Sequence, residues 1–316
     1  MNREATAVVF EQPGTISLRS VGLTDPGAGD CVVDIEWSGI STGTERLLWD
    51  GRMPPFPGLD YPLVPGYESV GRIRTVTPGV ALQPGQRVFV PGSRGFTDVK
   101  GLFGGASAQL VVPAERIVAV GDELGEEATL LALAATAYHA IQRHDGGNTL
   151  PDLVVGHGVL GRLLARLVKA LGKADLVVWE SNSRRASGGE GYAVLDPAAD
   201  SRRDYRLICD VSGDAGLLDL LIGRLAPGGA IVLAGFYNAP LAFGFPQAFM
   251  REIQLAVAAE WQHRDLECVI TMVRSGQLSL DGLISHRSSP DLAADAYRTA
   301  FESADCLKMI LDWSSL

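Results

Sequence analysis

The residues Asp152-Leu-Val-Val-Gly156-His157-Gly158-Val159-Leu160-Gly161 form the most informative stretch of this 316-residue chain. A short apolar run, typical of a buried strand, leads into glycines with the spacing GxGxxG. From Leu160 onward, apolar residues recur at helical spacing, at positions 160, 163, 164, 167, 168 and 171. A strand, a glycine turn and an amphipathic helix in this order predict the phosphate-binding turn of a parallel α/β domain.

Each glycine of this turn has a separate expected role. Gly156 permits the tight turn, Gly158 lets the backbone approach a pyrophosphate, and Gly161 allows the helix to pack closely on the sheet. The helix begins with Val159 and Leu160. Its first backbone N–H groups and its partial positive charge are expected to face the phosphates of a dinucleotide.

An acidic residue follows the next predicted strand, Leu176–Trp179. Glu180 lies about 20 residues beyond the glycine turn, where an acid accepts the ribose hydroxyls of adenosine, so the sequence favours NAD. Arg184 and Arg185 follow and could pair with a 2′-phosphate, so NADP stays open. S-adenosylmethionine, which also binds at a glycine-rich turn and an acid, is the competing ligand. His157 lies inside the turn and is expected near the pyrophosphate.

Strands and helices alternate from about residue 122 onward. Strands are expected at 152–155, 176–179, 206–211, 230–234 and 253–257, and helices at 126–142, 159–171, 215–225 and 265–275. Continuous apolar strands of this kind predict a parallel sheet that helices cover on both faces. Ser212-Gly213 and Gly235-Phe236 follow two of these strands, at the carboxyl ends where open α/β sheets bind their ligands.

The N-terminal part has a different texture. Short β-branched runs at 5–10, 31–37, 69–76, 87–90 and 109–112 alternate with Pro-Gly turns, which predicts an antiparallel barrel or sandwich. A last helix, 291–303, and a strand, 307–311, are too short to form a domain and are expected to pack on this part. We therefore expect one domain from 1–122 and 285–316, and a second from 123–284.

Composition excludes several classes of function. A net charge of −10 argues against a nucleic-acid partner. No apolar run reaches the roughly 18–20 residues of an integral membrane segment, and the N-terminus lacks an apolar signal core, so a cytoplasmic protein is expected. The four cysteines have no CxxC spacing, which argues against a disulfide framework or a cysteine-rich zinc site.

Several further motifs resemble the medium-chain dehydrogenase/reductase superfamily over almost the whole chain. They are Ser-Gly-Ile-Ser-Thr-Gly-Thr-Glu (38–45), Val-Pro-Gly-Tyr-Glu-Ser-Val-Gly (64–71), Gly-Gly-Ala-Ser-Ala-Gln (104–109) and Ala-Thr-Ala-Tyr-His-Ala (135–140). The resemblance implies a GroES-like β domain, a Rossmann domain and a tail that returns to the first domain. It also implies that Thr136 faces the nicotinamide side of the cofactor, and that the protein forms a homodimer.

The chain departs from this superfamily at the metal site. At the three catalytic zinc-ligand positions it carries Ser41, Tyr67 and Ala132, which do not form the N/S ligand set that zinc prefers. Residues 91–108 contain no cysteine, so the structural zinc lobe is missing as well. Glu68 keeps its place, but a lone carboxylate is not a metal site. The sequence predicts a protein without metal.

A finer resemblance is to the bacteriochlorophyllide a dehydrogenase group, in residues 38–46, 64–71 and 154–162, with Tyr67 and His157 as distinguishing choices. It implies oxidation of the 3-(1-hydroxyethyl) group of a tetrapyrrole substrate to 3-acetyl, with NAD accepting the hydride. By motif position, four side chains should surround the vacated metal site: Ser41, Thr44, Tyr67 and Glu68. The hydroxyls are expected to bind the reacting oxygen and pass its proton on, unless Tyr67 merely fills the space. Glu45 and Glu68 are expected to pair with arginines such as Arg46, or to relay protons.

Three rival functions stay open. A zinc-free quinone- or enoyl-type reductase that uses NADPH would share the fold. A nucleotide-binding protein without catalytic activity would also keep the glycine turn. A methyltransferase would bind S-adenosylmethionine in place of a pyridine nucleotide.

Overall fold

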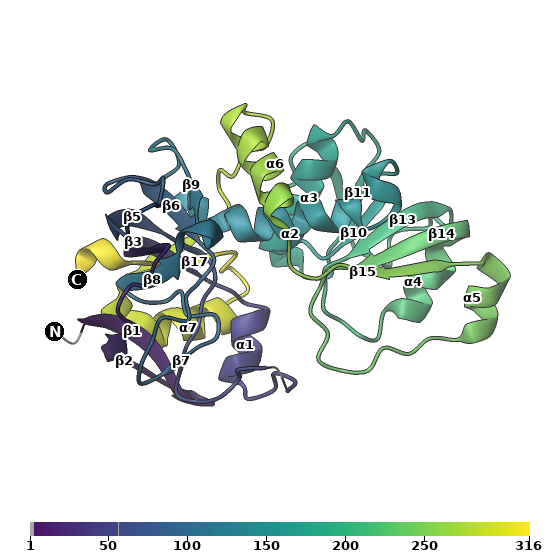
Figure 1. The fold of residues 1–316 in the computed structure, drawn as a ribbon. Helices are drawn as coiled ribbons and strands as arrows, with labels where there is room; N and C mark the ends of the chain where they lie inside the picture. Colours follow the sequence, from purple (N-terminus) through teal and green to yellow (C-terminus); the bar gives the residue numbers. More distant parts are fainter. Residues whose placement is uncertain (1–2, 56) are drawn as a thin grey trace. The chain divides into compact units, whose positions relative to one another are not determined.

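The computed structural model describes residues 3–55 and 57–316, and the chain divides into two compact units (Figure 1). Unit 1 comprises Met1–Ala132 and Asp281–Leu316, and unit 2 comprises Leu133–Leu280. Unit 1 is built from mainly antiparallel sheets and unit 2 from a parallel sheet with helices. The structure thus contains the two predicted parts, an antiparallel β domain and a parallel α/β domain. None of the helices within the described residues is long and apolar enough to cross a bilayer.

The described residues of unit 1 form two sheets. The four-stranded sheet has the order β2 (Thr15–Leu23), β1 (Arg3–Gln12), β4 (Leu63–Val64), β7 (Lys100–Gly101). The seven-stranded sheet has the order β16 (His286–Ser288), β17 (Met309–Asp312), β3 (Asp30–Ile40), β5 (Ser69–Val76), β6 (Arg87–Val90), β9 (Val118–Ala119), while β8 (Gln109–Pro113) pairs with β3. Strand β2 was not expected from the sequence, because most of its side chains are only partly buried and give no clear alternation.

The C-terminal strand joins the centre of the larger sheet. β17 pairs antiparallel with β3, with Met309 opposite Ile40 and Leu311 opposite Ser38. Just past it, the indole N–H of Trp313 donates to the Ser38 hydroxyl at 2.8 Å. Helix α7 (Ala293–Glu302) also belongs to unit 1, and its Tyr297 side chain is buried in the hydrophobic core of that unit. The last segment of the chain therefore lies beside the motif that begins at Ser38.

Unit 2 is a six-stranded parallel sheet in the order β12 (Ala193–Leu195), β11 (Val177–Trp179), β10 (Leu153–Val155), β13 (Tyr205–Asp210), β14 (Leu225–Leu233), β15 (Gln254–Val257). Figure 1 shows α3 (Val159–Ala170) and α6 (His263–Arg274) on one side of this sheet, and α4 (Leu218–Arg224) and α5 (Phe245–Arg251) on the other. Helix α2 (Leu131–Gln142) leads into the unit. The expected helix 215–225 is shorter in the structure, because a turn precedes Leu218.

Candidate functional site

The glycine turn of unit 2 is shaped by steric limits at two of its glycines. Gly156 follows β10 with φ +102°, in the left-handed region that favours glycine. A Cβ on Gly161 would lie 1.8 Å from the carbonyl oxygen of Gly156, so helix α3 approaches the turn as closely as backbone allows. A Cβ on Gly158 would meet nothing within 4 Å. Protein atoms therefore fill the space beside Gly161, whereas the space beside Gly158 is open.

Helix α3 begins at Val159, with Gly158 as its N-cap, and no side chain caps it. The N–H groups of its first turn, which starts with Val159 and Leu160, have no partner within the helix. Open space at Gly158 beside such N–H groups is the arrangement that binds phosphate in dinucleotide domains. The residues present therefore fit the pyrophosphate of a dinucleotide.

The acid after β11 is bonded to this turn. One carboxylate oxygen of Glu180 accepts the backbone N–H of His157 at 3.1 Å, and the other accepts the N–H of Asn182 at 2.8 Å. The imidazole of His157 is fully buried. Its Nδ1 lies 2.6 Å from the carbonyl oxygen of Arg185, and its Nε2 lies 2.9 Å from the hydroxyl of Tyr192. The His157 side chain thus contacts the segment that follows Glu180.

The predicted residues at the ends of β13 and β14 lie together. A Cβ on Gly235 would lie 2.9 Å from the backbone N of Gly213, so the two segments are in close contact. Ser212 donates its N–H to the carboxylate of Asp210 at 2.9 Å, and burial raises the pKa of that carboxyl. Phe236 keeps 47% of its surface exposed. Thr136 is half-buried on α2.

The predicted hydroxyl residues of unit 1 form one cluster. The phenolic oxygen of Tyr67 lies 2.6 Å from the hydroxyl oxygen of Ser41 and 3.5 Å from that of Thr44. The Tyr67 ring packs edge-on against Phe103, with ring centroids 5.2 Å apart. Desolvation of the phenol, and then the nearby charge of Glu68, raise the pKa of Tyr67 well above its usual 10. The phenol therefore stays neutral at physiological pH.

Glu68 pairs with a lysine that the sequence did not suggest. Its carboxylate is fully buried and forms an ion pair with Lys308, whose ammonium also donates to the carbonyl oxygen of Ile40 at 3.0 Å. Desolvation raises the pKa of Glu68, and the lysine charge opposes that rise. Among the described residues, no group hydrogen-bonds the Oε1 atom of Glu68. The expected arginine partner was wrong, because Lys308 comes from 240 residues away, just before β17.

Glu45 is hydrogen-bonded to the backbone of Ser41. It is fully buried at the start of α1 (Thr44–Trp49), where it accepts the backbone N–H of Ser41 at 2.9 Å and the hydroxyl of Tyr297 at 2.7 Å. Burial raises the pKa of Glu45 to about 7. Here too the expected arginine partner was wrong. Arg46 lies on the exposed side of the helix, and its Nε atom is 3.8 Å from a carboxylate oxygen of Asp50.

The side chains at the family's zinc-ligand positions do not fit zinc. Ser41 and Tyr67 offer a neutral hydroxyl and a neutral phenol, and the buried Ala132 offers no ligating atom. Zinc sites in proteins use thiolate, imidazole and carboxylate ligands. In the part of the chain that the structure describes, no group of three or more His, Cys, Asp or Glu side chains could hold a metal ion.

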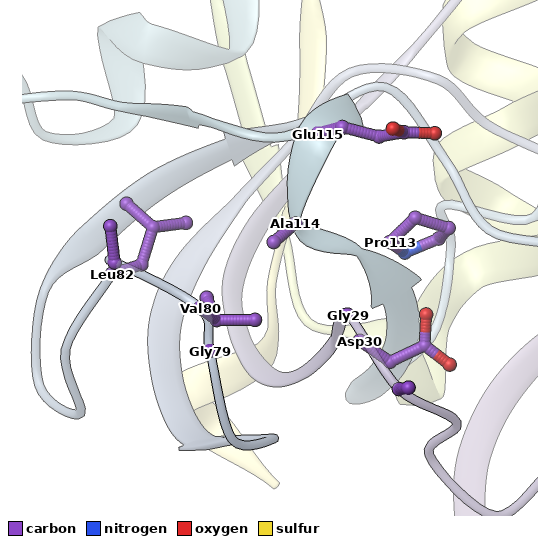
Figure 2. A pocket seen from close by; sticks show the side chains of 10 residues that line it. Gly29, Asp30, Gly79, Val80, Leu82, Pro113, Ala114 and Glu115 are labelled. Atoms are coloured by element: carbon purple, nitrogen blue, oxygen red, sulfur yellow. The ribbon is translucent and has the colours of Figure 1, made fainter.

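A shallow hollow of about 620 Å³ lies elsewhere in unit 1 (Figure 2). It is lined mostly by glycine, alanine and proline residues, together with the larger side chains of Val80, Leu82 and Glu115 and that of Asp30. None of the ten residues that line it is a predicted site residue, so the hollow does not bear on the cluster around Tyr67.

Comparisons with known proteins identify the family of the chain. Residues 27–122 match the alcohol dehydrogenase GroES-like domain family. A Rhodobacter capsulatus protein named 2-desacetyl-2-hydroxyethyl bacteriochlorophyllide A dehydrogenase is 56% identical over 311 residues, which cover 98% of each chain. The chain belongs to the same family, within the medium-chain dehydrogenase/reductase superfamily. It is therefore an oxidoreductase, as its sequence motifs predict.

Other medium-chain dehydrogenases extend the comparison. A Cereibacter sphaeroides protein of the same name is 54% identical over 313 residues, again covering 98% of each chain. Among solved structures, the 2R,3R-butanediol dehydrogenase from Bacillus subtilis aligns with a TM-score of 0.84 at 19% identity, covering 98% of this chain and 99% of its own. At that identity the likeness shows the medium-chain dehydrogenase fold alone.

Proposed function

We propose that the protein oxidises the hydroxyethyl substituent of a bacteriochlorophyllide to an acetyl group, passes the hydride to NAD, and uses side-chain hydroxyls in place of catalytic zinc. The observation that carries this proposal is the hydrogen-bonded pair Tyr67–Ser41, which occupies two zinc-ligand positions of the superfamily. The names of the two relatives that are more than half identical supply the substrate class.

Unit 2 would hold the dinucleotide through the glycine turn and Glu180. The open position at Gly158 and the N–H groups that begin α3 suit the pyrophosphate. The carboxylate of Glu180 suits ribose hydroxyls and repels a 2′-phosphate, so we propose NAD rather than NADP. Thr136, Ser212-Gly213 and Gly235-Phe236 are proposed to line the rest of the cofactor site. When bound, the nicotinamide supplies the hydride acceptor.

Unit 1 would move the proton. A neutral phenol is a weak base, so Tyr67 is proposed as a relay rather than as an anion. The carbinol proton moves to the Tyr67 oxygen as the phenol proton moves to the Ser41 oxygen, and the former Ser41 proton leaves to water. Both hydroxyls end with one proton each, while the carbinol C–H leaves as hydride and a C=O bond forms. Thr44 lies at the edge of hydrogen-bond range and is proposed to orient the phenol.

The two buried carboxylates would position this relay. Glu45 holds the backbone of Ser41 through its N–H. Glu68 and its lysine are proposed to fix the segment that carries Tyr67. A ketone conjugated with the macrocycle is an easier product than a simple ketone, which reduces the need for a Lewis acid.

A comparison of substrates tests the proposal. The protein is incubated with NAD and hydroxyethyl bacteriochlorophyllide a, and separately with NADPH and a quinone or an enone. The proposal expects the absorbance shift of an acetyl product together with NADH in the first mixture, and no NADPH oxidation in the second. The reverse result would support a quinone- or enoyl-type reductase, for which the neighbouring Arg184 and Arg185 offer a 2′-phosphate site. Binding of cofactor without turnover in either mixture would support a nucleotide-binding protein.

We also propose that the protein is a homodimer that pairs through the edge of unit 2. Strand β15 ends the parallel sheet, and its Leu255 and Val257 are 43% and 61% exposed. Helix α5, which precedes β15 in the chain, also exposes Phe245, Phe249 and Met250. An exposed apolar edge strand pairs readily with a second copy of itself about a two-fold axis.

A further inference from the structure

The segment from 183 to 192 has little regular structure but is firmly attached to the glycine turn. It runs from the 3-10 turn Ser183–Arg185 to β12 and includes Gly188, Gly189 and Gly191. Gly188 and Gly191 have φ values of +84° and +76°, which glycine tolerates. Residues 186–192 belong to no helix or strand, so the position of the segment depends on side chains from elsewhere in unit 2.

His157 supplies the first attachment. Its Nδ1 lies 2.6 Å from the carbonyl oxygen of Arg185, which accepts but cannot donate, so Nδ1 carries the proton. The Nε2 atom then accepts the hydroxyl of Tyr192 at 2.9 Å, and the two rings meet edge to face with centroids 5.7 Å apart. Burial lowers the pKa of His157, which keeps the imidazole in this neutral form. Two hydrogen bonds thus tie the turn to both ends of the segment.

Arg162, in the first turn of α3, supplies the second attachment. Its guanidinium donates to the carbonyl oxygens of His157 at 3.2 Å, of Arg185 at 3.2 Å and of Ser187 at 2.8 Å. A Cβ on Gly188 would lie 2.2 Å from its Nη1 atom, so the segment is shaped around this side chain. The carbonyl of Arg185 accepts from both His157 and Arg162, which makes it the centre of the attachment.

Glu180 connects the same turn to the base of the segment. Its carboxylate accepts N–H groups from His157 and Asn182. The phosphate-binding turn, the acid proposed to bind ribose and the segment 183–192 are therefore held by one hydrogen-bonded group. We name the side chains of His157, Arg162 and Tyr192, together with the Arg185 carbonyl, the latch.

We propose that the latch positions Glu180 and the segment 183–192 for the adenosine half of the dinucleotide. His157 and Tyr192 are positioning residues, because Tyr192 acts through the His157 imidazole, and His157 acts through the Arg185 carbonyl and, by its backbone N–H, through the carboxylate of Glu180. The inference rests on the proposed function in one respect, that unit 2 binds a pyridine dinucleotide. Since the latch lies at the phosphate turn and the adenosine side and not at the proposed nicotinamide side, its loss should weaken cofactor affinity and leave the chemical step unchanged.

Two latch variants and one matched control test this inference. Tyr192→Phe removes the hydroxyl that His157 accepts, and His157→Asn keeps a donor near Nδ1 but removes the Nε2 acceptor. The control, Tyr205→Phe, removes a buried hydroxyl that donates to Asp200 at 2.6 Å in the same unit, away from the glycine turn. NADH binding is titrated by fluorescence and ADP-ribose binding by calorimetry, and kcat is measured at saturating NAD.

Each latch variant should bind NADH and ADP-ribose about tenfold more weakly than wild type, by the same factor for both ligands. The double variant should lose no more affinity than either single variant, because both substitutions remove the same hydrogen bond, the one between Tyr192 and His157. The kcat of each variant should stay within about twofold of the wild-type value. Tyr205→Phe should bind both ligands as wild type does.

Wild-type affinity in Tyr192→Phe, or a loss for NADH that ADP-ribose does not share, would overturn the latch while leaving the proposed function intact. An equal loss in Tyr205→Phe would show that the effect comes from general destabilisation, and would also overturn it. If the wild-type protein binds neither NADH nor ADP-ribose, the proposed function fails and the latch fails with it.

Discussion

The phenolic oxygen of Tyr67 lies 2.6 Å from the hydroxyl oxygen of Ser41. Ser41 directly follows β3 and Tyr67 precedes β5, so two adjacent antiparallel strands bring the pair together. Zinc-dependent members of the superfamily carry metal ligands at these two positions. A metal ion promotes loss of the carbinol proton by lowering the pKa of the carbinol. A neutral phenol that is hydrogen-bonded to a serine can instead accept the carbinol proton while it passes its own proton to the serine.

Tyr67→Phe should lower kcat by roughly 100-fold or more, because the variant keeps the ring but loses the relay hydroxyl. The affinity for NADH should not change, since the glycine turn belongs to unit 2. Tyr61→Phe is the matched control, because it removes a hydroxyl that donates to the Leu48 carbonyl at 2.5 Å in the same unit. Steady-state rates at several pH values check this prediction, and unchanged turnover at every pH would exclude a proton role for Tyr67.

Two glycines of the turn should respond differently to alanine. Gly161→Ala places a Cβ 1.8 Å from the Gly156 carbonyl oxygen, so it should destabilise the fold by about 3 kcal/mol or more. Gly158→Ala meets no protein atom within 4 Å, so its stability should change by less than about 1 kcal/mol. Its methyl group would obstruct the pyrophosphate, and NADH affinity should fall roughly tenfold or more. Denaturant melts and NADH titrations of both variants separate the two effects. A Gly158→Ala variant with wild-type affinity would argue against phosphate binding at this turn.

Glu45→Gln should change the dependence of stability on pH. Burial raises the pKa of Glu45 from an ordinary 4.5 to about 7, so between these values the folded state binds more protons than the unfolded state. The free energy of unfolding of the wild type should therefore fall as pH rises through this window. At about 1.4 kcal/mol per pKa unit, the fall attributable to Glu45 is about 3 kcal/mol. The glutamine variant should lack this part of the fall and be the more stable protein at pH 8. Identical slopes in denaturant melts of both proteins between pH 4.5 and 8 would contradict the assignment.

Gly39→Ala should separate the buried ion pair. A Cβ at this position would lie 2.1 Å from Oε2 of Glu68 and 2.9 Å from Cε of Lys308. Breaking a buried pair in this way should destabilise unit 1 by about 3 kcal/mol or more. Gly43→Ala, at the start of α1, meets nothing within 4 Å and should cost about 1 kcal/mol or less. Chemical denaturation measures the free energy of unfolding of both variants. Equal values would mean that the Glu68–Lys308 ion pair does not require glycine at position 39.

Val257→Lys should dissociate the proposed dimer. A charge on the edge strand β15 disfavours pairing with a second copy. Leu292→Lys is the control, because Leu292 is similarly exposed, at 55%, but lies in unit 1. Analytical ultracentrifugation should show a dimer for the wild type and for Leu292→Lys, and a monomer for Val257→Lys. A wild-type monomer, or a dimer that Val257→Lys leaves intact, would exclude this interface.

Local features of the sequence predicted much of the fold. The glycine turn follows from the steric needs of a few adjacent residues, and the alternation of apolar strands with helices is equally local. Short elements were missed for physical reasons. Strand β12 has three residues, and α5 exposes several large apolar side chains, so neither shows a clear periodic pattern.

The cluster of Ser41, Thr44 and Tyr67 could be expected from motif position, because each residue replaces or adjoins a ligand of the superfamily. The partners of the buried carboxylates could not. Lys308 reaches Glu68, and Tyr297 reaches Glu45, only because the C-terminal segment folds back on unit 1. A pairing over more than 200 residues leaves no local signal, which is why arginines near Glu45 were expected instead.

The most direct measurement is turnover by protein from which metal has been removed. The protein is dialysed against a chelator, its zinc content is measured, and it is assayed with NAD and hydroxyethyl bacteriochlorophyllide a. If hydroxyls replace the metal, the metal-free protein forms one NADH per acetyl product at the rate of the untreated protein, and added zinc changes nothing. Activity that disappears with the metal and returns with zinc would contradict the account.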